Sequence, residues 1–326
     1  CCFRKFRVMT AGLQFQRLLV TGRDRARFLH NFCTNAVREL PQGRSVEAFF
    51  VDVKARVLAH GYVLALPERH EVHVLGSAGA ADVLLRHLDR YIITEDVQLR
   101  CVGADQQGQL WLLPESSAPA SVRLSETGCE ALPDEGVRHV FRWAAGTMCV
   151  VAGVSEVVAG AVAAFPPGAV AGSARQIECW RIDECFPVVG VDVTDQHLAP
   201  EADRNVQAVS YQKGCYLGQE PIARIDALGH VNRALRRICV AGVDESESAD
   251  QLWCGAQLRG ADGVVLGQFS SFQQQSGTDR GVGLAMVRLS AVPISAVRAD
   301  GVSCVVQSVG RAAETVRGAD SGAEVS

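Results

Sequence analysis

The sequence lacks several features that would place it in a specialised class of protein. Its 12 cysteines form no C-x-x-C pair and no ferredoxin-like run, which argues against a disulfide framework and against a metal cage. No stretch of about 20 uninterrupted apolar residues occurs, because residues 150–165 are broken by Ser155, Glu156 and two glycines. Basic residues are not in excess, since the formal net charge is −4. We therefore expect no membrane span and no extended surface for nucleic acid phosphates.

The chain does have the length and apolar content of a large globular protein. Its 326 residues are 48% hydrophobic, which is enough for two or three lobes with buried cores. Isolated cysteines are typical of a reducing compartment, so we expect a cytoplasmic protein. We interpret Met9 as the true start and residues 1–8 as an upstream extension; the alternative is a lipoprotein that begins at a lipidated Cys1.

Hydrophobic periodicity predicts mixed α and β structure in the first part of the chain. Residues from Ala81 to Tyr91 carry an apolar stripe at helical spacing. His70 and His73 would lie on opposite faces of a surface strand, so they do not form a metal site. Short strands are expected at residues 18–20, 48–51, 57–66 and 72–75.

The second half of the chain shows a different pattern. Residues 150–165 are interpreted as strand, turn and packed small residues, and the polar segment 103–135 as a loop or lobe boundary. From residue 241 onward, short β-prone runs recur between glycine-containing turns. This indicates a small C-terminal barrel or sandwich, followed by a disordered tail at residues 318–326.

The most informative segment is KGCYLGQE at residues 213–220, which sets Cys215 between two glycines, a lysine and a Gln-Glu pair. Glycines adopt backbone conformations closed to other residues and let a ligand approach the main chain. Lys213, two residues before the thiol, would lower the pKa of Cys215 and raise its thiolate fraction. The alternative is a tight turn in which Cys215 is a small buried hydrophobe.

The segments that flank this motif carry a resemblance to a known family. They are, in order, RIDECFP at 181–187, GVD at 190–192, LAPE at 198–201, PIAR at 221–224 and VNRAL at 231–235. With this order and spacing, the chain resembles the YgfZ family of folate-binding iron–sulfur cluster assembly proteins. That family is similar to the T-protein (aminomethyltransferase) of the glycine cleavage system. Looser matches at 19–29, 267–271 and 283–285 extend the resemblance over most of the chain.

The resemblance implies an α+β, T-protein-like three-lobed folate-binding fold with a C-terminal β-barrel. We place the lobes at residues 9–115, 116–240 and 241–317, with the KGCYLGQE motif in the second lobe. In such relatives the first two lobes interleave in sequence, so these linear boundaries are approximate.

The resemblance also implies tetrahydrofolate as the cofactor. The pterin edge offers adjacent N–H donors that suit a single carboxylate, and Asp183 in the RID element is our candidate. The alternative is that Asp183 pairs with Arg181 or caps a turn. Glu201 either contacts the cofactor or holds the motif loop.

Further cofactor contacts are expected from the motif and from nearby arginines. The motif candidates are Tyr216, Gln219 and Glu220. The folate tail carries carboxylates that arginine side chains can meet, unless these arginines are plain solvated charges. The candidates for the tail are Arg224, Arg233, Arg236 and Arg237.

One departure separates this chain from the aminomethyltransferase itself. The T-protein resembles GG[VI]IDDLI at the segment that matches residues 55–62, and Ala59 and His60 stand where its two aspartates lie. Neither residue replaces a carboxylate that orients the folate nitrogen. We therefore expect a chain that is aminomethyltransferase-like but is not a glycine cleavage enzyme.

The sequence thus predicts a tetrahydrofolate-binding protein that supports assembly or repair of iron–sulfur clusters in client enzymes, with Cys215 as reactive centre and Lys213 beside it. By the resemblance, the clients include radical enzymes that thiolate tRNA. The alternatives are a folate-dependent one-carbon transferase and a folate-fold binding module without chemistry. Expected partners are iron–sulfur client or assembly proteins and a small-molecule folate, with the chain itself a monomer that holds no metal site. Whether Cys215 attacks, ligates iron or contacts folate stays open.

Overall fold

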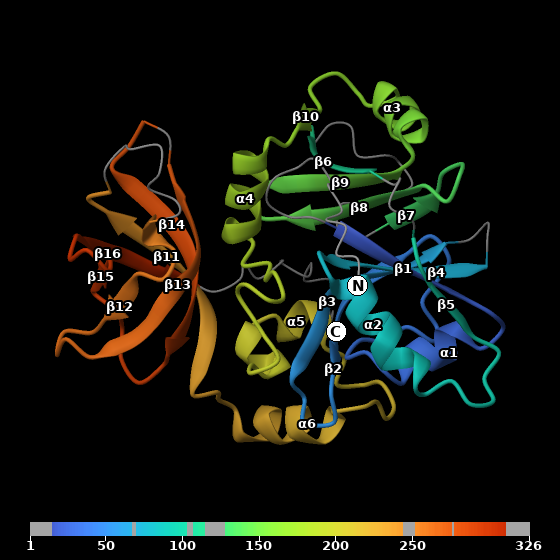
Figure 1. The fold of residues 1–326 in the computed structure, drawn as a ribbon, viewed down its shortest axis with the longest axis horizontal. Coiled ribbons are helices and arrows are strands. Elements are labelled where there is room, and N and C mark those ends of the chain that lie inside the picture. Colours follow the sequence, from blue (N-terminus) through green and yellow to red (C-terminus); the bar gives the residue numbers. More distant parts are fainter. Residues whose placement is uncertain are drawn as a thin grey trace, which may run out of the picture.

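The structure is a computed structural model that describes residues 15–66, 70–102, 107–114, 128–243, 252–275 and 277–310. Two antiparallel sheets lie together, and a barrel stands to one side of them (Figure 1). The expected start at Met9, the expected tail from Gly318 and residues 103–106 and 115–127 of the polar boundary segment lie outside the described residues. None of the helices in the described part of the chain has the length and apolar character of a membrane span.

The first sheet has five strands in the order β2-β3-β4-β1-β5. They are β1 (Phe15–Thr21), β2 (Ser45–Val51), β3 (Val57–Leu66), β4 (Glu71–Ser77) and β5 (Gln98–Cys101). Two helices accompany the sheet, α1 (Arg25–His30) and α2 (Ala80–Asp89). Leu84 and Leu88 of α2 are fully buried in the core of this lobe, as the apolar stripe predicted.

Strand β4 differs from the surface strand expected around His73. It pairs with β1 on one side and β3 on the other, so it lies inside the sheet. The His73 side chain is 0% exposed, and its Nε2 lies 3.1 Å from Glu71 Oε2. Alternation along one strand cannot reveal which strands lie beside it, and for this reason the expectation was wrong.

The second sheet has the order β10-β6-β9-β8-β7. Its strands are β6 (Gln107–Leu113), β7 (Gly128–Ala131), β8 (Val137–Trp143), β9 (Gly146–Gly153) and β10 (Val170–Ala171). Residues 150–165, expected as strand, turn and packed small residues, form the end of β9 and the helix α3 (Ser155–Ala163). Glu156 in the first turn of α3 complements the helix dipole, and Val158 packs against Cys149 and Val151 of β9.

Helix α4 (Ala174–Asp183) follows the second sheet and lies between it and the barrel (Figure 1). It begins with a capping box, because Ser173 Oγ accepts the Gln176 N–H and Gln176 Oε1 accepts the Ser173 N–H. One apolar cluster contains Tyr62 of β3, Phe141 of β8 and Phe186 beyond α4. The two sheets therefore share a core.

The lobes interleave along the chain. Strand β6 pairs with β9, so the expected boundary at residue 115 is wrong by one strand and the second sheet already begins at β6. Three short helical elements then return to the first lobe: η2 (Ala199–Ala202), α5 (Asn205–Ala208) and α6 (Gln219–Leu228). Their side chains Ala202, Ala208 and Ile222 pack with Phe49 and Val51 of β2.

The C-terminal lobe is a closed barrel with the strand order β11-β14-β13-β12-β15-β16, as expected. Its strands are β11 (Arg233–Ala241), β12 (Gln257–Arg259), β13 (Val265–Gln274), β14 (Arg280–Arg288), β15 (Ser295–Val297) and β16 (Ser303–Gly310). Because β11 pairs with β14 and β16, the barrel begins at β11 and not at residue 241. Trp253, Phe269 and Phe272 are buried in its core.

A buried polar contact fastens the barrel to the rest of the molecule. Asp192 Oδ2 accepts a 2.6 Å hydrogen bond from Arg181 Nη1, and its Oδ1 accepts from the hydroxyls of Ser270 and Ser271 at 2.5 and 2.7 Å. Arg181 also donates to Ser271 Oγ at 2.6 Å. Arg181 of the RID element thus positions the barrel against α4.

Candidate functional site

The motif KGCYLGQE forms a loop that leads into helix α6, and Cys215 is exposed on it. A side chain at Gly214 would meet no atom of the described residues within 4 Å, so this part of the loop is open. Gly218 is different. Its φ is +78°, and a Cβ there would overlap the carbonyl oxygen of Asp52. The two glycines therefore leave the thiol uncovered and let the base of the loop approach the turn after β2.

Lys213 anchors this loop to the first lobe. Its Nζ donates to the carbonyl oxygens of His30, Cys33 and Asn35 at 2.5, 2.7 and 2.9 Å. It also lies 4.7 Å from the ring centroid of Tyr216. Burial lowers the pKa of Lys213, while all three of its donors are occupied by carbonyl oxygens.

The predicted effect of Lys213 on Cys215 finds no support in these contacts. An ammonium group that donates to three carbonyls stabilises the backbone it touches, so the role that the structure gives Lys213 is to hold the loop. Leu217 adds a backbone hydrogen bond to the Asn31 carbonyl at 2.8 Å. The base of the loop is fixed and its thiol is exposed.

The other motif candidates also serve the loop and the start of α6. Tyr216 is 8% exposed and packs in the cluster beneath the loop. Gln219 Oε1 accepts the backbone N–H of Tyr216 at 3.3 Å. Glu220, in the first turn of α6, and Arg224, one turn later, are exposed.

Cys215 stands apart from most other cysteines that the structure describes. Apart from Cys254, those others are buried or partly buried. Burial raises the pKa of six thiols and so disfavours their thiolate forms. These six are Cys33, Cys101, Cys129, Cys149, Cys185 and Cys304.

Asp183 lies in a second place, where α4 meets the barrel. Its Oδ1 is 2.8 Å from Arg237 Nε and 2.7 Å from Arg237 Nη2. The Asp183 side chain is 39% exposed. Asp183 therefore pairs with Arg237 and not with Arg181, which is buried against Asp192. Both of these contacts involve the Oδ1 atom of Asp183.

An aromatic side chain that the sequence reasoning missed lies on the same helix. Trp180 precedes Asp183 by three residues on α4, which puts the two side chains on neighbouring positions of one helix face. Trp180 is partly exposed and packs against the core shared by the two sheets. A carboxylate and an aromatic ring are the two kinds of group that suit a pterin, and α4 carries both at helical spacing, so these residues fit that group.

Glu201 holds the chain that runs towards the motif. Its Oε2 accepts the Leu198 N–H at 2.9 Å, and its Oε1 lies 2.8 Å from Arg233 Nε. Arg236 pairs with Asp203 at 2.5 Å. Of the four arginines expected at a folate tail, three thus have carboxylate partners within the protein, and Arg224 is exposed on α6.

The sequence reasoning also missed a buried ionic cluster formed by Glu47, His60, Glu184 and Arg204. Glu47 Oε2 is 2.7 Å from Arg204 Nη2, and its Oε1 is 2.7 Å from His60 Nε2. Arg204 Nη2 also lies 3.1 Å from Glu184 Oε1. Burial alone would raise the pKa of Glu47, but the Arg204 charge and its hydrogen bonds lower it to about 2. Burial raises the pKa of Glu184.

This ionic cluster places a carboxylate beside the segment that lacks the aspartates. In the register of β2 and β3, Phe49 lies opposite His60 and Glu47 opposite Tyr62, so Glu47 and His60 share one face of the sheet. Residues 47, 60, 184 and 204 are far apart in sequence, and no local motif could have revealed them. Among the residues that the structure describes, no group of three or more His, Cys, Asp or Glu side chains could hold a metal ion.

Two sheets that share a core and a closed C-terminal barrel define the three-lobed fold of the T-protein. The aminomethyltransferase T of the glycine cleavage system from Bartonella henselae matches the structure with a TM-score of 0.68. The match covers 90% of this chain and 82% of that one, at 15% sequence identity. No protein-family profile matches the chain.

Two curated proteins add a similarity in sequence. The "tRNA-modifying protein YgfZ" of Colwellia psychrerythraea is 24% identical over 241 residues, which cover 68% of each chain. The "Putative transferase At1g60990, chloroplastic" of Arabidopsis thaliana is 22% identical over 303 residues. That match covers 86% of this chain and 65% of the length of the plant protein. Together with the fold, these findings confirm the resemblance to the YgfZ family and its relationship to the T-protein.

Proposed function

We propose that this protein binds tetrahydrofolate and supports assembly or repair of iron–sulfur clusters in client proteins, with Cys215 as the reactive centre. The observation that carries the proposal is the contrast between an exposed thiol and the fixed residues around it: Lys213, Tyr216 and Gln219 hold the loop, and Cys215 is exposed on it. The similarity to a YgfZ protein supports the same assignment. A cytoplasmic location and client or assembly proteins as partners follow as parts of this proposal.

In this proposal, the folate pterin lies beside α4. The Asp183 carboxylate would accept the pterin N–H groups, and the Trp180 ring would supply an apolar wall. Arg237 would keep the Asp183 carboxylate charged and oriented. When bound, the folate would supply a reduced pterin next to the barrel, and its tail carboxylates would meet arginines exposed to solvent, such as Arg224.

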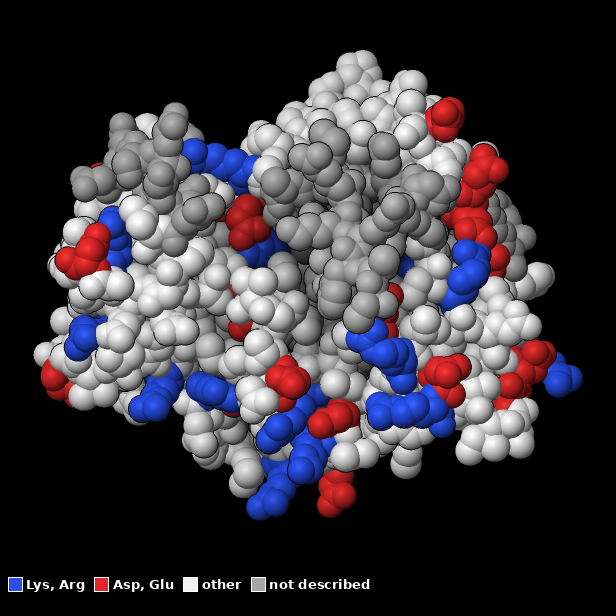
Figure 2. Space-filling model, in the orientation of Figure 1, with Lys and Arg blue, Asp and Glu red and all other residues white. Residues whose placement is uncertain are grey.

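Direct nucleic acid binding is not part of the proposal. Acidic and basic side chains are interspersed on the face of the molecule in Figure 2, including the lower edge around α6. The formal net charge of −4 gives no overall attraction to phosphates. A link with tRNA modification would therefore act through a client protein.

Asp183→Ala is expected to weaken tetrahydrofolate binding by about 1.5–3 kcal/mol, the usual range for a hydrogen bond to a charged group. Titration calorimetry under reducing conditions measures this change directly. Asp89→Ala, which removes another exposed carboxylate on the distant helix α2, is the matched control and should bind folate normally. Unchanged affinity in a folded Asp183→Ala protein would remove Asp183 from the site.

A folate-dependent one-carbon transferase is the second candidate, favoured by the fold and by the carboxylate of Glu47 beside His60. Glu47 is a poor base, because Arg204 and His60 occupy its oxygens and the residue is 6% exposed. We expect purified protein to release no ammonia and to form no methylene-tetrahydrofolate from an aminomethyl-lipoyl donor. A turnover rate comparable with that of a genuine aminomethyltransferase would support the transferase and contradict the cluster role.

A further inference from the structure

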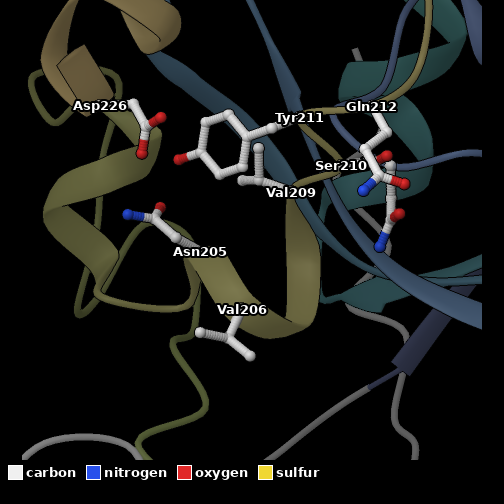
Figure 3. Close-up of a pocket in the computed structure, with 8 residues that line it drawn as sticks. Asn205, Val206, Val209, Ser210, Tyr211, Gln212 and Asp226 are labelled. Atoms are coloured by element: carbon white, nitrogen blue, oxygen red, sulfur yellow. The ribbon is translucent and has the colours of Figure 1, made fainter. Parts of the chain in front are cut away.

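A hollow of about 620 Å³ lies beside the Cys215 loop, between α5, the segment 209–212 and α6. Figure 3 shows the side chains that line it. Its size falls within the range of roughly 300–1,000 Å³ that is typical of ligand pockets. It shares no residue with the proposed pterin site at Asp183 and Trp180.

Three oxygen-bearing side chains converge on one side of this hollow. In Figure 3, Asn205, Tyr211 and Asp226 point toward one another. Burial, and then the nearby charge of Asp226, raise the pKa of Tyr211 to about 12, so its hydroxyl keeps a hydrogen that it can donate to Asp226. Asn205 Oδ1 is buried and accepts no hydrogen bond from any residue that the structure describes. A buried carbonyl oxygen without a donor is uncommon in folded proteins, because its desolvation is then uncompensated.

The oxygens of these three groups can act as acceptors for a ligand, while the Asn205 amide also carries an NH2 donor. The Tyr211 hydroxyl can direct its single hydrogen to Asp226, and lone pairs then remain on Tyr211, Asp226 and Asn205. Among the described residues that line the hollow, Asp226 is the one side chain with a formal charge. An acceptor set with one negative charge selects a ligand that is rich in donors and positively charged.

The remaining walls suit the apolar part of such a ligand. Val206 and Val209 line the hollow, and the exposed fractions of Val206 and Tyr211 are 56% and 46%. An exposed tyrosine ring attracts a cation placed over its face, and valine side chains cover an aliphatic stem. The hollow thus offers places for both the charged head and the chain of a basic side chain.

The position of the hollow links it to the thiol. Gln212 lines it, and Cys215 follows three residues later on the same loop. Three residues span at most about 11 Å when fully extended. A group held in the hollow would therefore lie close to the exposed thiol.

We propose that this hollow binds the cationic head of a lysine or arginine side chain from a partner protein that docks at the Cys215 loop. Asn205 and Asp226 would accept its hydrogen bonds, and Tyr211 would lie against the cation. The assignment goes beyond the proposed folate and cluster function, and it requires neither folate binding nor cluster chemistry.

The test is a titration of the full chain followed by nuclear magnetic resonance of its backbone amides. The probe is N-acetyl-arginine amide, and N-acetyl-citrulline amide is the matched ligand of the same shape without the charge. We expect saturable shifts of the signals from residues 205–212 with the arginine probe. The citrulline probe should bind about ten-fold more weakly, as expected when a charged hydrogen bond is lost.

Three variants assign the contacts. Asp226→Asn should weaken binding of the arginine probe about ten-fold, while Asp89→Asn on the distant α2 should leave it unchanged. Asn205→Asp should tighten binding, because it adds a second negative charge at an acceptor position. Tyr211→Leu should weaken binding by removing the ring from the cation. Melting temperatures check that each variant is folded.

Several outcomes would overturn the proposal. Equal affinity for the arginine and citrulline probes would show that charge plays no part. Weaker binding by Asn205→Asp would mean that the amide faces the hollow with its NH2 group and not as an acceptor. Spermidine is the free-cation probe: if it binds more tightly than the arginine probe, the occupant is a free polyamine and the assignment to a protein side chain is wrong.

Discussion

Cys215→Ser protein is expected to fold and bind tetrahydrofolate normally, yet to fail almost completely to restore iron–sulfur enzyme activity in cells that lack the protein. The thiol is exposed and the loop is held by its neighbours, so the exchange removes little packing. Such surface substitutions change the free energy of unfolding by about 0.5 kcal/mol or less. Melting temperature, folate titration and complementation measure the three properties separately.

Cys254→Ser is the matched control for this experiment. Cys254 is also exposed but lies on the barrel lobe, away from the motif. Its variant should complement fully. If Cys215→Ser also complements fully, or if Cys215 does not react with iodoacetamide in the folded protein, the thiol is not the reactive centre and the motif acts only by shaping the loop.

Arg204→Met is expected to lower the free energy of unfolding by about 3–5 kcal/mol, because it leaves buried carboxylates without their counter-charge. Arg204 is 1% exposed and serves both Glu47 and Glu184. Urea denaturation of the purified protein measures the change. If Arg204→Met yields no folded protein, Glu184→Gln offers a milder variant, which removes one charge and keeps the hydrogen-bonding shape.

Arg233→Met is the comparison variant for Arg204→Met. Arg233 also pairs with a glutamate, Glu201, but its side chain is 38% exposed. Water reaches the Arg233 guanidinium although Glu201 is only 10% exposed, so this variant should lose clearly less stability than Arg204→Met. Similar losses in the two variants would contradict the expectation that the more deeply buried ion pairs of Arg204 contribute more to stability.

Local pattern was enough to predict much of the fold. The apolar stripe of α2 and the short β-prone runs of the barrel follow from one helix face and from alternation along single strands. The boundary before β6 could not be predicted in this way, because it depends on pairing with β9, about 40 residues later. Helix α3 was missed because its small and β-branched residues resemble a strand until Glu156 and the packing of Val158 are considered.

The candidate site, like the fold, could be predicted only in part from the sequence. The motif placed Cys215 on a glycine-flanked loop, and the structure finds it exposed there. The partners of Lys213 lie at residues 30–35, near the other end of the chain, so sequence spacing suggested its neighbour Cys215 instead. The pairing of Asp183 with Arg237 could not be predicted for the same reason, because the two residues meet only where the barrel contacts α4. Long-range contacts of this kind leave no local signal.

The anchoring of Lys213 has a consequence for any encounter with a partner. Disordered recognition segments must lose conformational freedom at the moment of binding, which weakens the complex. Here the loop is already ordered by three carbonyl contacts from the first lobe, and only the open surroundings of Gly214 leave the tip room to adjust. The thiol is therefore presented as a preorganised group, and its position depends on correct folding of a lobe nearly 200 residues away in sequence.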